Sequence, residues 1–244
     1  MSLSSTSKNK SRYDLSLIIP FYDEGSNLVE AARAAQKSLI ESSLSFEILL
    51  VDDGSTDESG AEARRLAEEH PSVFRYLSHT RNRGLGAAFW TGARAAVGRF
   101  VLLVPVDNPV GPELLENFFR KAEEAAVVVG VRGPREGYSL IQKIASRALY
   151  LLARYLFRLP DLGDYTWIAL YDRSFLQSLD PTQTGILYNI EILATARRQN
   201  RPLKSTSAPM KPRTRGRGTV GRVSAWFRTA HEFFRLLYRF HFRD

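Results

Sequence analysis

Acidic side chains come at or shortly after the ends of three apolar runs of this sequence. Asp23 and Glu24 follow the run at 15–19, Asp52 and Asp53 follow the run at 46–51, and Asp107 follows the run at 100–106. A carboxylate accepts hydrogen bonds from the ring N–H groups of uracil or guanine, and another can hold a divalent cation on a diphosphate. Turn formation and helix capping would explain any one of these loops alone. The three in succession favour a nucleotide-sugar site.

The elements that would position these loops alternate between strand and helix. The predicted strands are Leu15–Ile19, Phe46–Val51, Val73–Ser78, Phe100–Val106 and Ala126–Val131. The predicted helices between them are Ser26–Glu41, Asp57–His70, Gly86–Val97 and Pro112–Glu124. This alternation is typical of a mostly parallel α/β sheet flanked by helices. Ligands of such sheets bind beyond the carboxyl ends of the strands, where the acidic loops are expected.

The second half of the chain has a different pattern. We expect helices at Ser139–Leu159, Leu187–Gln199 and Ser224–Phe242, a strand at Tyr165–Tyr171, an extended segment at Pro202–Pro209 and a Gly/Arg-rich loop at Lys211–Gly221. The expected organisation is a flexible tail at 1–12, an α/β domain at 13–210, and a basic loop with an amphipathic helix at 211–244.

Charge and composition narrow the class of protein. The chain has 244 residues, 44% of them hydrophobic, a formal net charge of +8 and no cysteine, so it is globular in character and has no disulfides or thiolate metal sites. Residues 197–244 contain 13 Lys and Arg against 2 acidic residues. A local basic block of this kind indicates an anionic partner. No apolar run reaches the ~20 residues that a membrane-spanning helix needs.

Two predicted helices combine a basic face with an apolar face. In the helix at 139–159 the basic residues are Lys143, Arg147, Arg154 and Arg158, and the apolar ones are Ile141, Ile144, Ala148, Leu152, Tyr155 and Leu159. In the helix at 224–242 the basic residues are Arg228, Arg235 and Arg239, and the apolar ones are Trp226, Phe227, Ala230, Phe233, Phe234, Leu237 and Phe240. Such helices are suited to an anionic membrane surface. The alternative is that their apolar faces pack on the domain core or on a partner chain.

Several segments together resemble family 2 glycosyltransferases, and among them the dolichol-phosphate mannose synthases and related polyprenyl-phosphate sugar transferases. The matching segments are LSLIIPFYDEGSNL, ILLVDDGSTDES, NRGLGAAFWTGARAAVGRFVLLVPVDN, VVVGVRGPREG, ALYDRSFL and RTRGRGT. They extend over most of the chain, from Leu15 to Thr219. The resemblance implies a GT-A (Rossmann-like) fold, here followed by a C-terminal amphipathic helix.

The resemblance also implies roles for individual residues. The nucleotide pocket would be lined by Pro20, Tyr22, Glu24, Asp52 and Asp53, with Arg81, Gly84 and Gly86 packed nearby. The catalytic groups would be Asp107, as the metal ligand, and Arg132, Arg147 and Arg213, near the phosphates of donor and acceptor.

This chain departs from the family pattern at the metal motif. The first metal aspartate of the family aligns with Pro105, so Asp107 is the one motif ligand left, and a frequent Gln two positions further on is Pro109. One carboxylate and a diphosphate can still hold Mg²⁺ or Mn²⁺, because Mg²⁺ keeps several of its waters. A metal-independent enzyme and a non-catalytic binder of nucleotide sugars remain alternatives.

The sequence therefore predicts a hexosyltransferase that acts from the cytoplasmic face of a membrane. It would move a sugar, with inversion, from GDP-mannose or a UDP-sugar to a polyprenyl phosphate, as a peripheral protein on an anionic surface. Transfer to a polysaccharide is an alternative acceptor reaction. A basic module that binds nucleic acid or membrane is the alternative of a different class, but nucleic acid would leave the acidic loops unexplained.

Overall fold

The computed structural model describes residues 11–108, 110–133, 139–208 and 223–242 of the chain. In these residues the strands are β1 (Tyr13–Phe21), β2 (Phe46–Asp52), β3 (Phe74–Ser78), β4 (Gly98–Leu103), β5 (Val127–Val131), β6 (Ala169–Asp172) and β7 (Leu203–Ser207). The helices are α1 (Asn27–Glu41), α2 (Ser59–Glu69), α3 (Leu85–Ala95), α4 (Pro112–Ala122), α5 (Leu140–Leu156), α6 (Arg173–Gln177), α7 (Tyr188–Arg198) and α8 (Val223–Phe242).

The described strands form one sheet in the order β3-β2-β1-β4-β6-β5-β7. The pairs β1–β2, β1–β4, β2–β3 and β5–β7 are parallel, and β6 is antiparallel to both of its neighbours. The carboxyl ends of β1, β2, β3, β4 and β5 therefore lie at one edge of the sheet. This mostly parallel α/β sheet confirms the predicted fold class.

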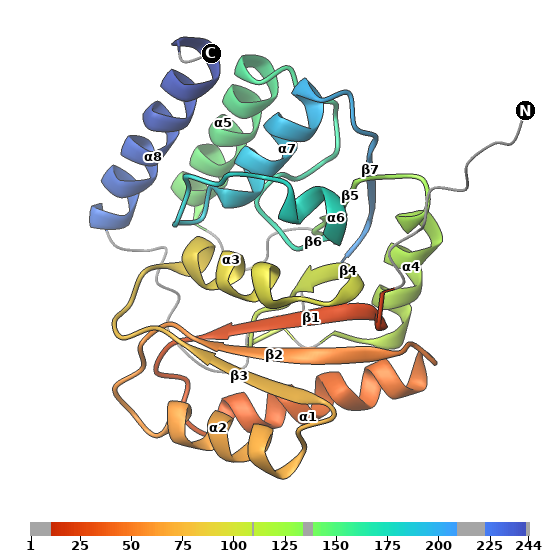
Figure 1. The fold of residues 1–244 in the computed structure, drawn as a ribbon. Coiled ribbons are helices and arrows are strands. Elements are labelled where there is room, and N and C mark those ends of the chain that lie inside the picture. Colours follow the sequence, from red (N-terminus) through yellow and green to blue (C-terminus); the bar gives the residue numbers. More distant parts are fainter. Residues whose placement is uncertain (1–10, 109, 134–138, 209–222, 243–244) are drawn as a thin grey trace, which may run out of the picture.

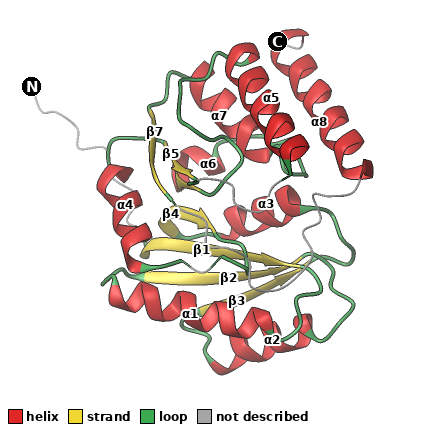
Figure 2. Ribbon diagram, turned by 180° about the vertical axis from the view of Figure 1, so that it is seen from behind, coloured by secondary structure: helices red, strands yellow, loops and turns green. Residues whose placement is uncertain are grey.

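Helices cover both faces of the sheet (Figure 1). The core under α1, α2 and α4 contains Leu15, Leu17 and Ile19 of β1, whereas Ile18 belongs to the core under α3 and α5–α8. This alternation follows from the two-residue period of a strand. Seen from behind, α1 and α2 lie on one side of the sheet, and α3, α5, α7 and α8 lie on the other (Figure 2).

Strand β4 ends three residues earlier than predicted. The amide of Val104 still donates to Ile18 O at 2.9 Å, but Pro105 has no amide hydrogen and its carbonyl accepts from Asn108 N at 3.1 Å. The chain therefore leaves the sheet and turns, which places Asp107 in a loop beyond the strand.

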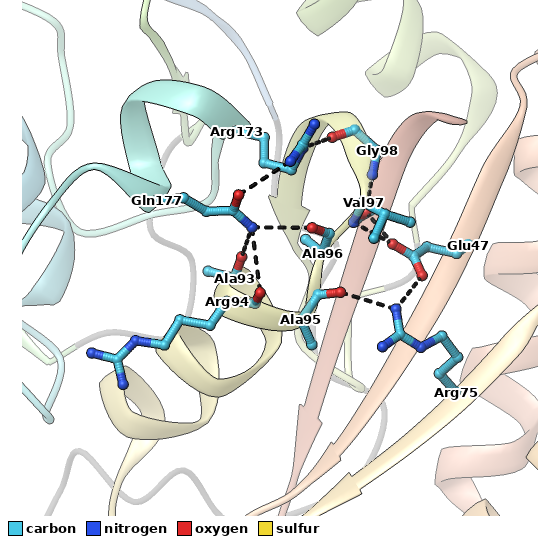
Figure 3. A network of polar contacts seen from close by, with 11 residues as sticks. Glu47, Arg75, Ala93, Arg94, Ala95, Ala96, Val97, Gly98, Arg173 and Gln177 are labelled. Carbon is cyan, nitrogen blue, oxygen red and sulfur yellow. Dashed lines mark hydrogen bonds and ion pairs between the residues drawn. The ribbon is translucent and has the colours of Figure 1, made fainter. Parts of the chain in front are cut away.

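Helix α3 is fixed at its C-terminus by a polar network (Figure 3). The carboxylate of Glu47, which is 2% exposed, accepts from Arg75 Nη1 and from the amide of Val97, both at 2.8 Å. Arg75 and Gln177 also donate to the last carbonyl groups of the helix, those of residues 93–96. These bonds satisfy groups that have no partner within a helix. The network lies at the amino ends of β2, β3 and β4, away from the acidic loops.

The two amphipathic helices pack differently from each other, and α8 follows the alternative of packing on the domain core. Phe233 and Leu236 of α8 are buried in the core, so its inner face is not free for a membrane. Helix α5 buries Tyr150 and Ala153 instead of the bulky apolar residues on its other side. Leu159, predicted on that outer side, is 4% exposed. The side chains of Trp226, Phe227 and Arg228 lie outside the described set.

Candidate nucleotide-sugar site

The loops after β1 and β2 are joined by hydrogen bonds. Asp23, which has a positive φ of 51°, accepts from Thr56 N at 2.7 Å. Ser59 Oγ accepts from the amides of Glu24 and Gly25 at 2.9 and 2.8 Å. The first two acidic loops predicted from the sequence therefore form one continuous rim, which leaves Tyr22 43% exposed beside it.

The carboxylate of Asp52 holds the turn after β2. Its Oδ1 atom accepts from Ser55 N at 2.8 Å, and its Oδ2 atom accepts from the phenol of Tyr76 at 2.9 Å. Burial, and next the bond to Asp52, raise the pKa of Tyr76. The phenol is therefore a stable donor at neutral pH, and both Asp52 oxygens have protein partners.

Asp53 binds the loop that follows β3. Its Oδ1 atom accepts from Arg83 N at 2.9 Å and lies 2.7 Å from His79 Nδ1, and its Oδ2 atom accepts from Gly84 N at 2.8 Å. The side chains of Asp53 and His79 are 7% and 4% exposed. This contact joins residues 26 positions apart, and no local sequence pattern reports it.

The glycines before and within α3 allow the backbones to approach closely. Gly54 has φ +81°, and a Cβ there would lie 2.4 Å from the Arg81 carbonyl carbon. Gly84 has φ +96°, and a Cβ at Gly86 would lie 2.6 Å from the carbonyl oxygen of Gly185. Only glycine fits such positions. Gly84 and Gly86 therefore allow the N-terminus of α3 to pack directly against the backbone of the 182–187 segment. Arg81, Gly84 and Gly86, which the resemblance implies near the nucleotide, lie between the end of β3 and the first turn of α3. Arg81 is exposed.

The other predicted site residues at the strand ends lie along the same edge. Pro20 is buried in β1 and pairs with Val51, beyond the last β1–β4 pair at Ile18. Asp107 is half-buried in the loop after β4. The neighbouring carboxylate of Asp23, and to a lesser extent burial, raise the pKa of the Tyr22 phenol. This group therefore stays neutral at physiological pH.

The predicted metal site rests on Asp107. Within the described ranges, no group of three or more His, Cys, Asp or Glu side chains is placed to hold a metal ion. A lone carboxylate still fits Mg²⁺ or Mn²⁺ that is bound mainly through a diphosphate, because Mg²⁺ uses one or two carboxylates besides phosphates and water.

Arg132 is held by a carboxylate that the sequence did not point to. Its Nε atom donates to Asp164 Oδ2 at 2.7 Å, its Nη2 atom donates to Thr166 Oγ1 at 3.0 Å, and its guanidinium lies over the Trp167 ring at 5.1 Å. Asp164 is 5% exposed, which makes this a buried ion pair. Arg132 follows β5 at the predicted edge, but part of its charge is already neutralised.

The other predicted basic groups belong to α5 and to the Gly/Arg-rich loop at 211–221. Arg147 is exposed on α5, with its guanidinium over the Tyr150 ring at 5.4 Å. Arg213 lies outside the described residues, as does Arg215 of the same Gly/Arg-rich loop, which is a further candidate for binding the acceptor phosphate.

The family model described as "Glycosyl transferase family 2" matches residues 16–180. A protein of Salmonella choleraesuis named undecaprenyl-phosphate 4-deoxy-4-formamido-L-arabinose transferase is 32% identical over 138 residues, which is 57% of this chain and 42% of that protein. Its counterpart in Salmonella paratyphi B is 31% identical over the same shares. This chain thus spans less than half the length of these curated relatives.

Solved structures share the fold. Glucosyl-3-phosphoglycerate synthase from Mycobacterium tuberculosis, in complex with Mg²⁺ and uridine-diphosphate, superposes with a TM-score of 0.70 at 19% identity, covering 93% of this chain and 80% of that one. A mannosyltransferase from Pyrobaculum calidifontis, in complex with GDP-Man and Mn²⁺, has a TM-score of 0.65 at 21% identity, covering 96% and 65%.

Proposed function

This chain belongs to glycosyl transferase family 2, and we propose that it moves a sugar from a nucleoside-diphosphate donor to a polyprenyl phosphate, with inversion at the anomeric carbon. The observation that carries the proposal is the shared sheet edge at which the loops after β1, β2 and β4 bring Tyr22, Asp53 and Asp107. Named relatives of the matched region are undecaprenyl-phosphate transferases, and solved neighbours contain UDP or GDP-Man.

The donor would lie along this rim. Pro20, Tyr22 and Glu24 would bound the base and ribose on one side, and the turn held by Asp52 and Asp53 would bound them on the other. Since both oxygens of Asp52 and of Asp53 already accept hydrogen bonds, these two residues act mainly by fixing the loops. GDP-mannose and UDP-sugars are the donors to test first.

Asp107 would hold Mg²⁺ or Mn²⁺ together with the diphosphate of the donor. The bound cation would neutralise charge on the leaving diphosphate. Arg132 and Arg213 would add positive charge around the same phosphates. The chain's own contribution is then to place the anomeric carbon and to exclude water from it.

A phosphate acceptor suits this site because it is already ionised at pH 7. An oxygen of the polyprenyl phosphate attacks the anomeric carbon, the bond from that carbon to the diphosphate breaks, and the nucleoside diphosphate leaves. No strong general base is required, in contrast to attack by a sugar hydroxyl. Arg147, Arg213 and Arg215 would bind the acceptor phosphate.

The exposed face of α5 supports a membrane-bound acceptor. Its large apolar side chains include Ile141, Ile144 and Tyr155, which are 72%, 61% and 83% exposed. Lys143 and Arg147 are exposed on the same helix. Apolar side chains beside cations fit the boundary between lipid headgroups and acyl chains. Among the described residues no helix is long and apolar enough to cross a bilayer. On the exposed apolar and basic side chains of α5 we propose peripheral binding at the cytoplasmic face of a membrane.

A groove of about 800 Å³ also opens beside α5. Its lining combines apolar and basic side chains: Leu151, Arg154, Tyr155, Leu156, Arg158, Leu159 and His241. The apolar side chains of this lining match the hydrocarbon part of an amphiphile, and the arginines match an anionic head group.

A second candidate function is nucleotide-sugar binding without transfer, which Pro105 favours because it removes one carboxylate from the metal motif. The first experiment is thermal unfolding with UDP, GDP and their sugars, each with and without Mn²⁺. A ligand at 100 times its Kd stabilises by ~2.7 kcal/mol. For a chain of this size that is a shift of roughly 5–10 °C.

Transfer of labelled sugar to undecaprenyl phosphate then separates the two candidates. We expect transfer by the wild type and its loss in Asp107→Ala, with the fold of the protein intact. Nucleotide binding without any transfer would establish the binder. The absence of nucleotide binding in a folded sample would reject both.

A further inference from the structure

The segment at 182–187 lies between the N-terminus of α3 and helix α8. On the α3 side, Thr184 O accepts from Ala87 N at 3.0 Å, and Gly86 leaves no room for a Cβ against this segment. On the α8 side, a Cβ at Gly185 would overlap the carboxylate of Glu232. Close packing on both sides means that α3 and α8 cannot move independently of this segment.

A buried carboxylate fixes the same segment to α7 and α8. Glu191, which is 3% exposed, accepts from Thr182 N and Gln183 N, both at 2.9 Å, and from Thr182 Oγ1 at 2.7 Å. Arg239 of α8 donates to the same carboxylate at 2.5 Å and to Asp180 O at 2.8 Å. Arg239 thus faces inward, although its position on the basic stripe predicted a membrane-facing side chain.

The N-terminus of α3 is in turn bonded to the donor rim. The amides of Arg83 and Gly84 donate to Asp53 at the end of β2. The far end of α3 is fixed by the Glu47 and Gln177 network (Figure 3). Asp53 thus holds one side of the α3 N-terminus, and the 182–187 segment packs against the other side.

We infer that Glu191 and Arg239 are positioning residues of the donor site. Their ion pair holds the 182–187 segment against the N-terminus of α3, and thereby keeps Gly84 and Asp53 in the arrangement that takes a nucleotide. The inference rests on the proposed function for its ligand. It predicts that nucleotide affinity depends on how firmly α8 is seated, although Arg239 itself does not touch the donor.

The test compares Arg239→Gln with Arg235→Gln, a matched change at an exposed position of the same helix. Calorimetric titration measures Kd for UDP and for GDP with Mn²⁺, without lipid. If the segment is seated in about a tenth of the molecules, the apparent Kd rises roughly tenfold. We expect this rise for Arg239→Gln and no change for Arg235→Gln. Wild-type affinity in a folded Arg239→Gln protein would overturn the inference.

Hydrogen exchange in the nucleotide-free protein supplies a readout independent of the ligand. Faster exchange at the amides of residues 86–88 in Arg239→Gln, and not in Arg235→Gln, is the expected result. Unchanged exchange there would overturn the inference. If the wild type binds neither nucleotide, the proposed function fails, and the exchange result alone decides whether α8 positions α3.

A variant that removes both charges protects against misfolding of the single variant. Glu191→Gln with Arg239→Gln leaves no unpaired buried charge. The double variant also lacks the ion pair between α8 and the 182–187 segment. We therefore expect the same rise in Kd and the same faster exchange at residues 86–88. Wild-type behaviour of this double variant in both measurements would overturn the inference.

Discussion

The Nδ1 atom of His79 lies 2.7 Å from Oδ1 of Asp53, and its Nε2 atom lies 2.8 Å from Oγ1 of Thr91. Because a carboxylate only accepts, Nδ1 carries the proton of this bond. The imidazole therefore joins the end of β2 to the middle of α3. Three donors in all converge on Asp53, which makes its charge a structural requirement of the donor rim.

Asp53→Asn should destabilise the fold. An amide group has a donor in place of one acceptor oxygen, so it would oppose a backbone N–H of the loop after β3. An unsatisfied buried group costs about 1–3 kcal/mol, which lowers the melting temperature by roughly 2–12 °C in a chain of this size. Thermal unfolding measures this, with Asp180→Asn at an exposed position as the control. Equal melting temperatures for the two variants would contradict the role of Asp53.

The metal motif gives a prediction in the direction of gain. Pro105→Asp would place a second carboxylate two residues before Asp107, and affinity for a hard cation rises with ligand charge. We expect the Mn²⁺-dependent part of nucleotide binding to strengthen roughly tenfold. Titration of Mn²⁺ at fixed nucleotide measures it. Asp107→Ala is the converse variant and should remove the metal dependence. Retention of full metal dependence by Asp107→Ala would place the cation elsewhere.

The apolar face of α5 should determine membrane binding. Ile144→Glu with Leu152→Glu replaces two exposed apolar side chains by charges that an anionic surface repels. We expect loss of flotation with vesicles of phosphatidylcholine and phosphatidylglycerol. Ile40→Glu is the matched control, because Ile40 is 61% exposed on α1, on the other face of the sheet. Equal flotation of both proteins would remove α5 from the membrane contact.

The sequence predicted the sheet and its acidic edge because both depend on local pattern. Continuous apolar runs mark strands that are buried on both faces, and the acidic residues come at or shortly after the ends of these runs. The pairings of Asp53 with His79 and of Arg132 with Asp164 depend on loops meeting across 26 and 32 positions, which no local pattern reports. The amphipathic pattern of α5 shows two unlike faces but not which of them packs. Helix α6 was missed because it has only five residues.

The buried ion pair of Arg132 should show in stability as well as in transfer. Arg132→Met leaves Asp164 buried without its cation, which costs about 3–5 kcal/mol. Arg132→Met with Asp164→Leu removes the unpaired charge and should recover much of that loss. Urea denaturation of the two variants measures the difference. An Arg132→Met protein as stable as the wild type would show that Arg132 serves ligands and not the fold.

Alkaline pH should unfold this protein through its buried tyrosines. Burial, and next the neighbouring Tyr188, raise the pKa of Tyr171 well above its usual value, and its phenol donates to Asn189 at 2.8 Å. A raised folded pKa means that the stability is complete below about pH 10, where the unfolded group titrates, and is lost as the pH rises further. Each buried tyrosine adds about 1.4 kcal/mol of loss per pH unit in that range.

Tyr171→Phe isolates this contribution. The variant should lose about 1 kcal/mol at pH 7, because its hydrogen bond is gone, yet its stability should fall less steeply above about pH 10. Urea denaturation between neutral and alkaline pH gives both slopes. Tyr155→Phe, at an 83% exposed ring, is the control and should follow the wild type. Identical slopes for wild type and Tyr171→Phe would mean that another group drives the alkaline transition.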